Sequence, residues 1–270
     1  MIRNSYEISI VVPLHNEEEV FNPLIARLDD LVYDMAATGL NVEVVLVDDG
    51  SNDNTPFLIK LLTKANPHYT GLLLSRNFGH QMAVSAGLAY CRSTKAVFII
   101  DGDLQDPPEL LPVFYEHLTK GYDVVYGIRR NRKEPAIKRF AYNAFYKFLN
   151  KISSIDIPPD SGDFSLISRR VADILIDMPE ESRFLRGMRS WVGFKQIGVE
   201  YDRDGRHAGD SKYSFRKLWK LAKDGIYNFS ETPIALMRRA GMIAMLFSAV
   251  YFIYILYKKI AFNSVPEGFT

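Results

Sequence analysis

The chain has 270 residues and a formal net charge of +1 at pH 7, and 47% of its residues are hydrophobic. That is enough to bury a sizeable core, as one large domain or as one domain with an appendage. The nearly neutral charge indicates no class of partner, and nucleic acid is not an expected one. The single cysteine, Cys91, excludes an internal disulfide and is expected in the core. The apolar residues 8–14 are too few for a secretory signal.

Strands and helices alternate along the first half of the chain. Buried strands are expected at residues 8–13, 42–47, 71–75, 96–100 and 123–127. Helices are expected over 17–35, where Asn16 and Glu19 have capping-box spacing, from Thr55 as a cap before a proline, and over 79–91. This alternation predicts an α/β fold with a largely parallel sheet that is covered on both faces.

Polar residues follow each of the first four strands, where ligands bind in such sheets. The sequence contains neither G-x-G-x-x-G nor G-x-x-x-x-G-K-[ST], the two common glycine motifs that hold phosphates. Instead, Asp48 and Asp49 follow the second strand. Adjacent aspartates at this point are typical of a turn with Asx hydrogen bonds, and they also suit a nucleoside, with contacts to a base N–H and to ribose hydroxyls. We expect the nucleoside role.

Two further aspartates, Asp101 and Asp103, follow the fourth strand, with Gly102 between them to let the backbone bend. Both can direct oxygens at one hard divalent ion that also takes diphosphate oxygens. Gln105 is a candidate for a third, neutral oxygen ligand. Asp106 precedes two prolines and a glutamate, so we expect it to cap the next helix.

Four stretches, "VVPLHNEE", "LVDDGSNDNT", "SRNFGHQMAVSAGL" and "DGDLQDPPE", occur in this order. Together they resemble family 2 glycosyltransferases of the GT-A fold, in the polyprenyl-phosphate branch that includes dolichyl-phosphate mannose synthase and bactoprenol glucosyltransferases. The resemblance spans about residues 8–213. It implies a nucleotide-sugar site formed by Pro13, Glu17, Asp48, Asp49, Arg76 and Asp101. It also implies a Mg²⁺ or Mn²⁺ site formed by Asp101, Asp103 and Gln105, with Asp103 catalytic. Uridine is favoured over guanosine as the base of the donor.

The second half of the chain is expected to recognise the acceptor. The stretch "GDFSLISRR", residues 162–170, resembles the family segment that supplies a carboxylate near the reacting carbon of the sugar, which makes Asp163 the candidate base. A phosphomonoester has a second pKa of about 6, so at neutral pH it is already mostly a dianion. An orienting role for Asp163 therefore stays open beside the role of base.

A basic, glycine-bearing loop, "YDRDGRHAGDSKYS", covers residues 201–214. Such a loop is often a solvated surface, but this one resembles the R-x-x-G-x-[ST]-K-Y pattern of the family. Its arginine, serine and lysine side chains are suitable donors to phosphate oxygens. We expect acceptor-phosphate binding by Arg206, Ser211 and Lys212, with Arg129, after the fifth strand, as a fourth contact. His15, His68, His80 and His117 show no ligand spacing and are expected to be structural or surface residues.

Residues 240–257 carry no charge and, at about 1.5 Å per residue, can cross nearly the whole apolar core of a bilayer, roughly 30 Å. Seven basic residues lie between Lys212 and Arg239 and two directly follow the span, so the catalytic domain is expected on the cytoplasmic side. Upstream, residues 214–232 suit an amphipathic helix in the headgroup layer. The expected organisation is a catalytic domain over 1–213, an interfacial helix over 214–232, a transmembrane helix over 233–258 and a loop over 259–270. A fragment trimmed after its first crossing and a natural one-span protein both stay open.

These expectations describe an inverting hexosyltransferase at the inner membrane, which moves a sugar from a nucleotide-diphosphate donor to a polyprenyl phosphate. Two alternatives remain. One is a family 2 transferase that acts on a glycan acceptor, and the other is a non-catalytic, membrane-tethered binding protein. Homo-oligomerisation is left open.

Overall fold

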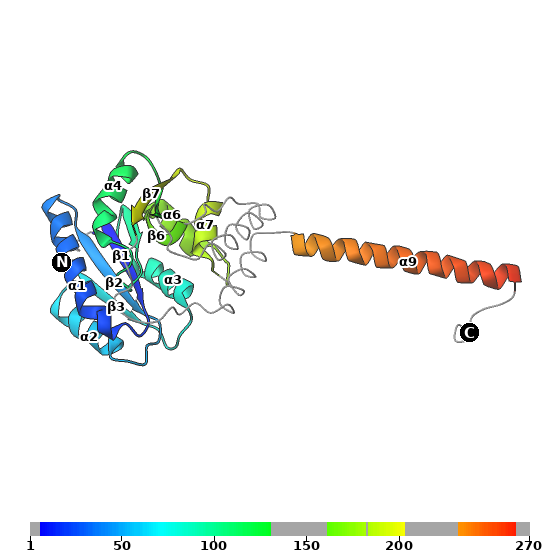
Figure 1. The fold of residues 1–270 in the computed structure, drawn as a ribbon, viewed down its shortest axis with the longest axis horizontal. Helices are drawn as coiled ribbons and strands as arrows, with labels where there is room; N and C mark the ends of the chain where they lie inside the picture. The colour runs from blue at the N-terminus through cyan, green and yellow to red at the C-terminus, as the bar shows by residue number, and fades with distance from the viewer. Residues whose placement is uncertain (1–5, 131–160, 182, 203–231, 263–270) are drawn as a thin grey trace.

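The computed structural model describes residues 6–130, 161–181, 183–202 and 232–262. The strands are β1 (Ile8–Leu14), β2 (Val42–Asp48), β3 (Tyr69–Leu73), β4 (Ala96–Ile99), β5 (Val124–Arg130), β6 (Ser161–Ser168) and β7 (Gln196–Asp202). The helices are α1 (Glu18–Ala37), α2 (Thr55–Ala65), α3 (His80–Tyr90), the 3₁₀ turn η1 (Pro108–Leu110), α4 (Leu111–Thr119), α6 (Arg169–Asp177), α7 (Leu185–Trp191) and α9 (Thr232–Phe262). The expected alternation of strands and helices is confirmed (Figure 1).

The described strands form one sheet in the order β3-β2-β1-β4-β6-β5-β7. β1 pairs in parallel with both β2 and β4, β2 pairs in parallel with β3, and β5 pairs in parallel with β7. β6 is the exception, because it runs antiparallel to β4 and to β5. The sheet is therefore mixed, with β6 as its one antiparallel strand among those described, and the predicted largely parallel sheet is confirmed for the other six strands. Because β6 is reversed, its first residues lie at the edge of the sheet where the other strands end.

Helices cover both faces of the sheet, and each face has its own apolar core. One core packs α1, α2 and α4 against residues such as Ile10, Leu46 and Phe98. The other packs α3, α6 and α7 against Val11, Val45 and Ile167. All residues of β1 and β2 are buried, as expected for strands covered on both sides. Cys91 is buried at the end of α3, which confirms its predicted place in the core.

The starts of two helices differ from the predicted ones. α1 begins at Glu18 without a side-chain cap, so the predicted capping box is wrong. Asn16 has a positive φ of 54°, and its side-chain oxygen accepts a hydrogen bond of 2.8 Å from the backbone N–H of Asn52 instead. α2 begins at Thr55, but Asn54 occupies the cap position. β3 lies two residues earlier than predicted, at Tyr69–Leu73.

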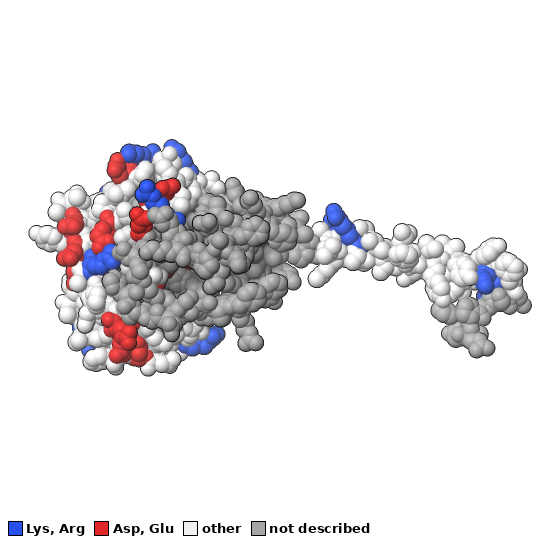
Figure 2. Space-filling view, in the orientation of Figure 1, with Lys and Arg blue, Asp and Glu red and all other residues white. Residues whose placement is uncertain are grey.

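α9 is long and apolar enough to cross a membrane, by length and composition. An 18-residue window within residues 234–262 has a mean hydropathy of 1.9, and none of that window is buried within the described part of the chain. In Figure 2 the helix surface is mostly white, with blue basic atoms near both ends. The helix continues past the predicted boundary at 258 to Phe262. The predicted interfacial helix over 214–232 lies outside the described residues, apart from the first residue of α9.

Candidate active site

Carboxylates from three strands meet at one edge of the sheet. Asp48 is the last residue of β2, Asp101 follows β4, and Asp163 lies near the start of β6. The reversed direction of β6 brings Asp163 to this edge although it comes at the beginning of its strand. The edge is the one where parallel α/β sheets bind ligands. The structure thus brings together carboxylates that the sequence placed in separate motifs.

His80, the first residue of α3, joins two of these carboxylates. Its Nε2 lies 3.5 Å from Asp101 Oδ1 and 3.4 Å from Asp163 Oδ2. Burial disfavours the charged imidazole, but Asp101 and Asp163 outweigh this effect and raise the pKa of His80 to about 9. The imidazole is therefore protonated at neutral pH and acts as their counter-charge. The interpretation of His80 as a structural or surface residue missed this place between two site carboxylates.

The pKa values of Asp101 and Asp163 are shifted in opposite directions. Burial raises the pKa of Asp101 to about 6, with His80 opposing the shift and the neighbouring Asp106, Asp103 and Asp163 adding to it. Burial also opposes ionisation of Asp163, but Arg186 and His80 outweigh it and hold the pKa of Asp163 well below its usual range. Asp163 is therefore a firmly ionised carboxylate at neutral pH.

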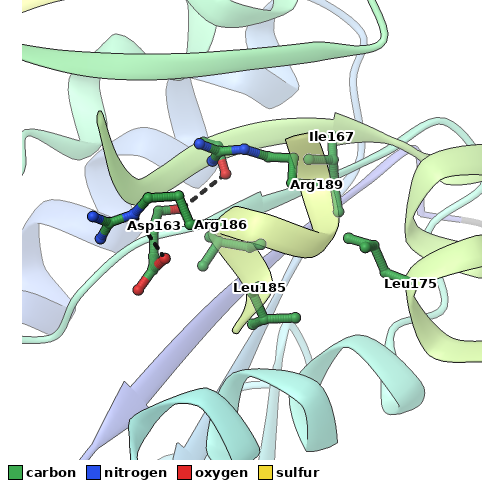
Figure 3. Close-up of a pocket in the computed structure, with 8 residues that line it drawn as sticks. Asp163, Ile167, Leu175, Leu185, Arg186 and Arg189 are labelled. Carbon is green, nitrogen blue, oxygen red and sulfur yellow. Dashed lines mark hydrogen bonds and ion pairs between the residues drawn. The ribbon is translucent and has the colours of Figure 1, made fainter. Parts of the chain in front are cut away.

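The side chain of Asp163 is held on several sides. Oδ2 accepts a hydrogen bond of 2.8 Å from Gln81 Nε2, and Oδ1 lies 3.7 Å from Arg186 Nε. Figure 3 shows Arg186 beside Asp163, with Arg189 on the next turn of α7 and the apolar side chains of Leu175 and Leu185 beyond. Asp163, Arg186 and Arg189 line a small pocket together with Ile99, Ser165, Ile167, Leu175 and Leu185.

Arg189 lies behind Asp163 and is only 3% exposed. Its guanidinium donates to the backbone oxygen of Gly162 at 3.4 Å and lies 5.1 Å from the ring centroid of Tyr126. Burial lowers the pKa of Arg189 to about 10, with Asp163 opposing the shift. The group is still charged at neutral pH, so α7 places two cations, Arg186 and Arg189, next to one carboxylate.

The loop after β4 holds the predicted metal ligands. Asp103 and Gln105 are half-buried, and Asp103 Oδ1 accepts a hydrogen bond of 3.2 Å from the backbone N–H of Gln105. Gly102 packs closely against β1, because a Cβ there would lie 2.3 Å from Leu14 Cδ2. The residue that bends the backbone is Leu104, which is buried with a φ of 60°. The sequence assigned that bend to Gly102.

The residues of this loop fit a divalent ion shared with a diphosphate. Asp101 Oδ1 is shielded from solvent and, apart from its 3.5 Å contact with His80, has no hydrogen-bond partner among the described residues, so it can still serve as an oxygen ligand of a cation. Within the described part of the chain, no group of three or more His, Cys, Asp or Glu side chains could hold a metal by itself. A site with two carboxylates suits Mg²⁺, because Mg²⁺ usually keeps several waters and takes substrate phosphates as further ligands.

Asp106 does not cap a helix, so this prediction is wrong. η1 has Pro107 at its cap position and no side-chain cap bond. Asp106 is fully buried and accepts a hydrogen bond from Tyr201 of β7, and its Oδ2 lies 3.8 Å from Arg129 Nη2. Arg129 Nε also donates to Tyr201 Oη at 3.3 Å. Arg129, the predicted fourth phosphate contact, lies within β5 rather than after it, and its guanidinium is engaged with this buried pair.

The two aspartates after β2 hold loops in place. Asp49 is buried, and its oxygens accept hydrogen bonds from the backbone N–H groups of Phe78 at 2.7 Å and Gly79 at 3.0 Å. Asp48 accepts from Ser51 N at 3.3 Å, which is the Asx turn that the sequence allowed. Asp49 therefore anchors the loop that leads into α3.

The other predicted nucleotide-sugar residues lie around this edge. Pro13 is buried in β1 next to the metal loop, since its oxygen is 3.2 Å from a Cβ built at Gly102. Glu17 is half-buried at the start of α1, and Arg76 is exposed with its guanidinium 4.0 Å from the ring centroid of Phe78. The predicted acceptor-phosphate residues Arg206, Ser211 and Lys212 lie outside the described residues.

Sequence reasoning missed four residues of this site: His80, Gln81, Arg186 and Arg189. The first two stand in the stretch "SRNFGHQ", which was read only as part of a motif. The two arginines in "FLRGMRSW" are three residues apart, a spacing that puts both on one face of a helix. That spacing indicates two neighbouring cationic side chains, but it does not predict which carboxylate they contact.

The mixed sheet, covered by helices on both faces, has the GT-A fold. A solved structure with this fold is the mannosyltransferase PcManGT from Pyrobaculum calidifontis in complex with GDP-Man and Mn²⁺. It matches with a TM-score of 0.54 and 17% identity, over 82% of this chain and 61% of that one. At this identity the match establishes the fold alone. The predicted fold class is confirmed.

The chain belongs to glycosyl transferase family 2, whose family model matches residues 9–175. It is 41% identical to an uncharacterized glycosyltransferase, YkcC, of Bacillus subtilis, over 98% of this chain and 81% of the relative. It is 37% identical to a prophage bactoprenol glucosyl transferase homolog of Escherichia coli, over 97% of this chain and 85% of the relative. The bactoprenol glucosyl transferase of Shigella phage SfX matches with the same identity and coverage. The predicted family is confirmed.

Proposed function

We propose that this protein transfers a hexose from a nucleotide-diphosphate sugar, with uridine as the favoured base, to a polyprenyl phosphate at the cytoplasmic face of the inner membrane. The observation that supports it most directly is the convergence of Asp101 and Asp163 on His80 at the ligand-binding edge of the sheet. The relatives named bactoprenol glucosyl transferase, at 37% identity over 97% of the chain, support a lipid phosphate as the acceptor.

The donor diphosphate would lie at the loop after β4. Asp101 and Asp103, with Gln105 as a neutral oxygen, would hold Mg²⁺ or Mn²⁺ there, and Asp101 has an oxygen to offer. The bound ion would neutralise the charge that develops on the departing diphosphate. Asp48 and Asp49 shape the neighbouring nucleotide pocket, in which Pro13, Glu17 and Arg76 form the wall.

Asp163 would orient the reacting groups rather than take a proton. Its pKa is held low by Arg186 and His80, and a carboxylate of low pKa is a weak base. The acceptor phosphate needs little deprotonation, because it is mostly a dianion at neutral pH. A phosphate oxygen would attack the anomeric carbon from the face opposite the leaving diphosphate, which inverts the configuration. The ionised Asp163 would accept a hydrogen bond from a sugar hydroxyl during this step.

The acceptor would approach from the membrane through the cationic loop of Arg206, Ser211 and Lys212, with Arg129 at the sheet. α9 supplies the apolar length for one crossing. Seven basic residues lie between Lys212 and Arg239 and two directly follow the span, which supports a catalytic domain on the cytoplasmic side by the positive-inside rule. The lipid phosphate would then lie at the surface from which the donor arrives.

A transfer assay with the full chain in detergent micelles tests the proposal. The reaction combines short-chain polyprenyl phosphate with UDP-glucose, UDP-N-acetylglucosamine or GDP-mannose, each with Mg²⁺, with Mn²⁺ or with EDTA. We expect a glycosyl polyprenyl phosphate of inverted anomeric configuration, formed only with a divalent ion. Nucleotide-sugar binding without transfer to the lipid would favour a glycan acceptor. Absence of nucleotide binding with either metal would favour a non-catalytic protein.

A further inference from the structure

Gln81, the second residue of α3, links three separate elements at the candidate active site. Its Nε2 donates a hydrogen bond of 2.8 Å to Asp163 Oδ2 at the start of β6. Its Oε1 accepts a hydrogen bond of 2.8 Å from the backbone N–H of Leu185, the first residue of α7. α7 also carries Arg186, which faces the other oxygen of Asp163. One amide thus connects the carboxylate to the helix that supplies its cation.

The two bonds fix which way the amide points. A backbone N–H can only donate, so the group that faces Leu185 must be the amide oxygen. The NH₂ group then necessarily faces Asp163, whose ionised carboxylate can only accept. A hydrogen bond to an ionised acceptor is stronger than one between neutral groups, and both bonds of Gln81 are partly buried. The rotamer of Asp163 is therefore determined from the side of α3.

The loop before α3 is itself anchored. Asp49 accepts hydrogen bonds from the backbone N–H groups of Phe78 and Gly79, directly before His80 and Gln81. Asp49 thus fixes the start of α3, and the first two side chains of this helix, His80 and Gln81, contact Asp163. The chain of contacts runs from Asp49 through the α3 start to Asp163.

We infer that Gln81 is a positioning residue for sugar transfer: it holds the Asp163 carboxylate in the orientation that the reacting sugar requires. This inference rests on the proposed function, because it assigns to Asp163 a contact with the donor sugar or the acceptor. Gln81 makes that contact effective without touching substrate. A small misplacement of a positioned group is enough to lower the rate strongly while substrate binding persists.

Two substitutions separate positioning from simple support of α7. Gln81→Glu keeps an oxygen that accepts from Leu185 N–H, but it turns a second carboxylate oxygen toward Asp163 and repels it. Gln81→Met has similar length and removes both hydrogen bonds. Gln196→Met is the matched control, because Gln196 Nε2 donates at 2.9 Å to the backbone oxygen of Arg189 in α7 and has no hydrogen bond to Asp163.

The assay is transfer from UDP-glucose, or from whichever donor the wild-type chain uses, to short-chain polyprenyl phosphate at pH 8. We expect kcat to fall about 10- to 100-fold in Gln81→Glu and Gln81→Met. We expect the donor KM, and nucleotide affinity measured by calorimetry, to stay within about twofold of wild type in both variants. Gln196→Met is expected to keep a wild-type kcat.

The outcomes are distinct. A wild-type kcat in Gln81→Glu, with a loss only in Gln81→Met, would show that Gln81 merely supports α7 and would overturn the assignment. Equal losses of nucleotide affinity and kcat in Gln81→Glu would overturn it as well. If Gln81→Met does not fold, Gln81→Glu decides alone, because it retains the bond to Leu185. Absence of transfer by the wild-type chain would instead overturn the proposed function, and the inference with it.

Discussion

The two ends of the sheet treat buried carboxylates differently. Where β2 begins, Glu43 is fully buried, and its oxygens accept hydrogen bonds from Ser9 Oγ and from the backbone and side chain of Arg92, all between 2.6 and 2.7 Å. Where the strands β1, β2 and β4 end, Asp101 Oδ1 has only the contact with His80 at 3.5 Å among the described residues. The first carboxylate is saturated and stabilises the fold. The second retains capacity for a ligand.

The largest expected effect on transfer activity is at the end of the sheet where β1, β2 and β4 end. Asp103→Asn removes one of the two charges of the predicted ion site, so we expect transfer to fall about 1,000-fold, because removal of one preorganised electrostatic group costs about this much. Thermal unfolding is expected to be unchanged. Glu116→Gln, at an exposed carboxylate of α4, is the control in both measurements. Full transfer activity of Asp103→Asn would remove the metal assignment.

At the opposite end of the sheet, where Glu43 lies, a substitution should lower stability and leave activity unchanged. Glu43→Ala leaves the buried Ser9 hydroxyl and the Arg92 backbone N–H without their acceptor, which costs about 2 to 3 kcal/mol of unfolding free energy. We expect the unfolding midpoint to fall by roughly 5 to 10 °C. Below that temperature kcat should be unchanged. A loss of kcat in the folded variant would contradict the division between the two ends.

The acceptor loop gives a smaller effect, in KM alone. Lys212→Ala or Arg206→Ala removes a charged donor to the lipid phosphate, so we expect the apparent KM for polyprenyl phosphate to rise about tenfold. The KM for the nucleotide sugar should not change. Lys120→Ala, at an exposed lysine directly after α4, is the control. Equal changes in both constants would argue against the assignment of the loop to the acceptor.

The smallest effect is a pH dependence of stability at His80. Its folded pKa of about 9 lies above the unfolded value of 6.5, so its contribution is complete below about pH 6.5 and is lost as the pH rises through about 9. The His80 side chain is 39% exposed, so solvent screens its ion pairs with Asp101 and Asp163. We therefore expect His80→Gln to lower the unfolding midpoint at pH 7 by at most about 2 to 4 °C. At pH 10 the two midpoints should converge. A difference that does not vary with pH would show that the ion pairs do not form.

Local patterns predicted most of the elements in the first half of the chain. Strands β1, β2, β4 and β5 and helices α1 to α3 appear within a few residues of their expected places, because apolar periodicity is a local property. The place of β6 depends on pairing with β4 and β5, which are far away in the sequence. No local pattern determines that pairing, and the antiparallel direction of β6 was not predicted.

The same distinction applies to the site. Asp101 and Asp103 follow a strand directly, so their place at the edge could be predicted from that strand alone. His80 and Asp101 are brought together by the packing of α3 against the sheet, and Gln81 meets Asp163 only because β6 is reversed. The cap assigned to Asp106 failed because Tyr201, on the last strand of the sheet, competes for its carboxylate. Each error concerns a partner that lies distant in the chain.

The reversal of β6 has a consequence for how this architecture can diversify. β5 ends and β6 begins at the ligand-binding edge, and β7 also ends there. Arg130, Ser161 and Asp202, from which the chain continues outside the described residues, therefore all lie at that edge. The segments that continue from these residues can lengthen, shorten or change composition while the strand register stays the same. Descendants of one ancestor could thus acquire new acceptors and inherit the donor machinery unaltered.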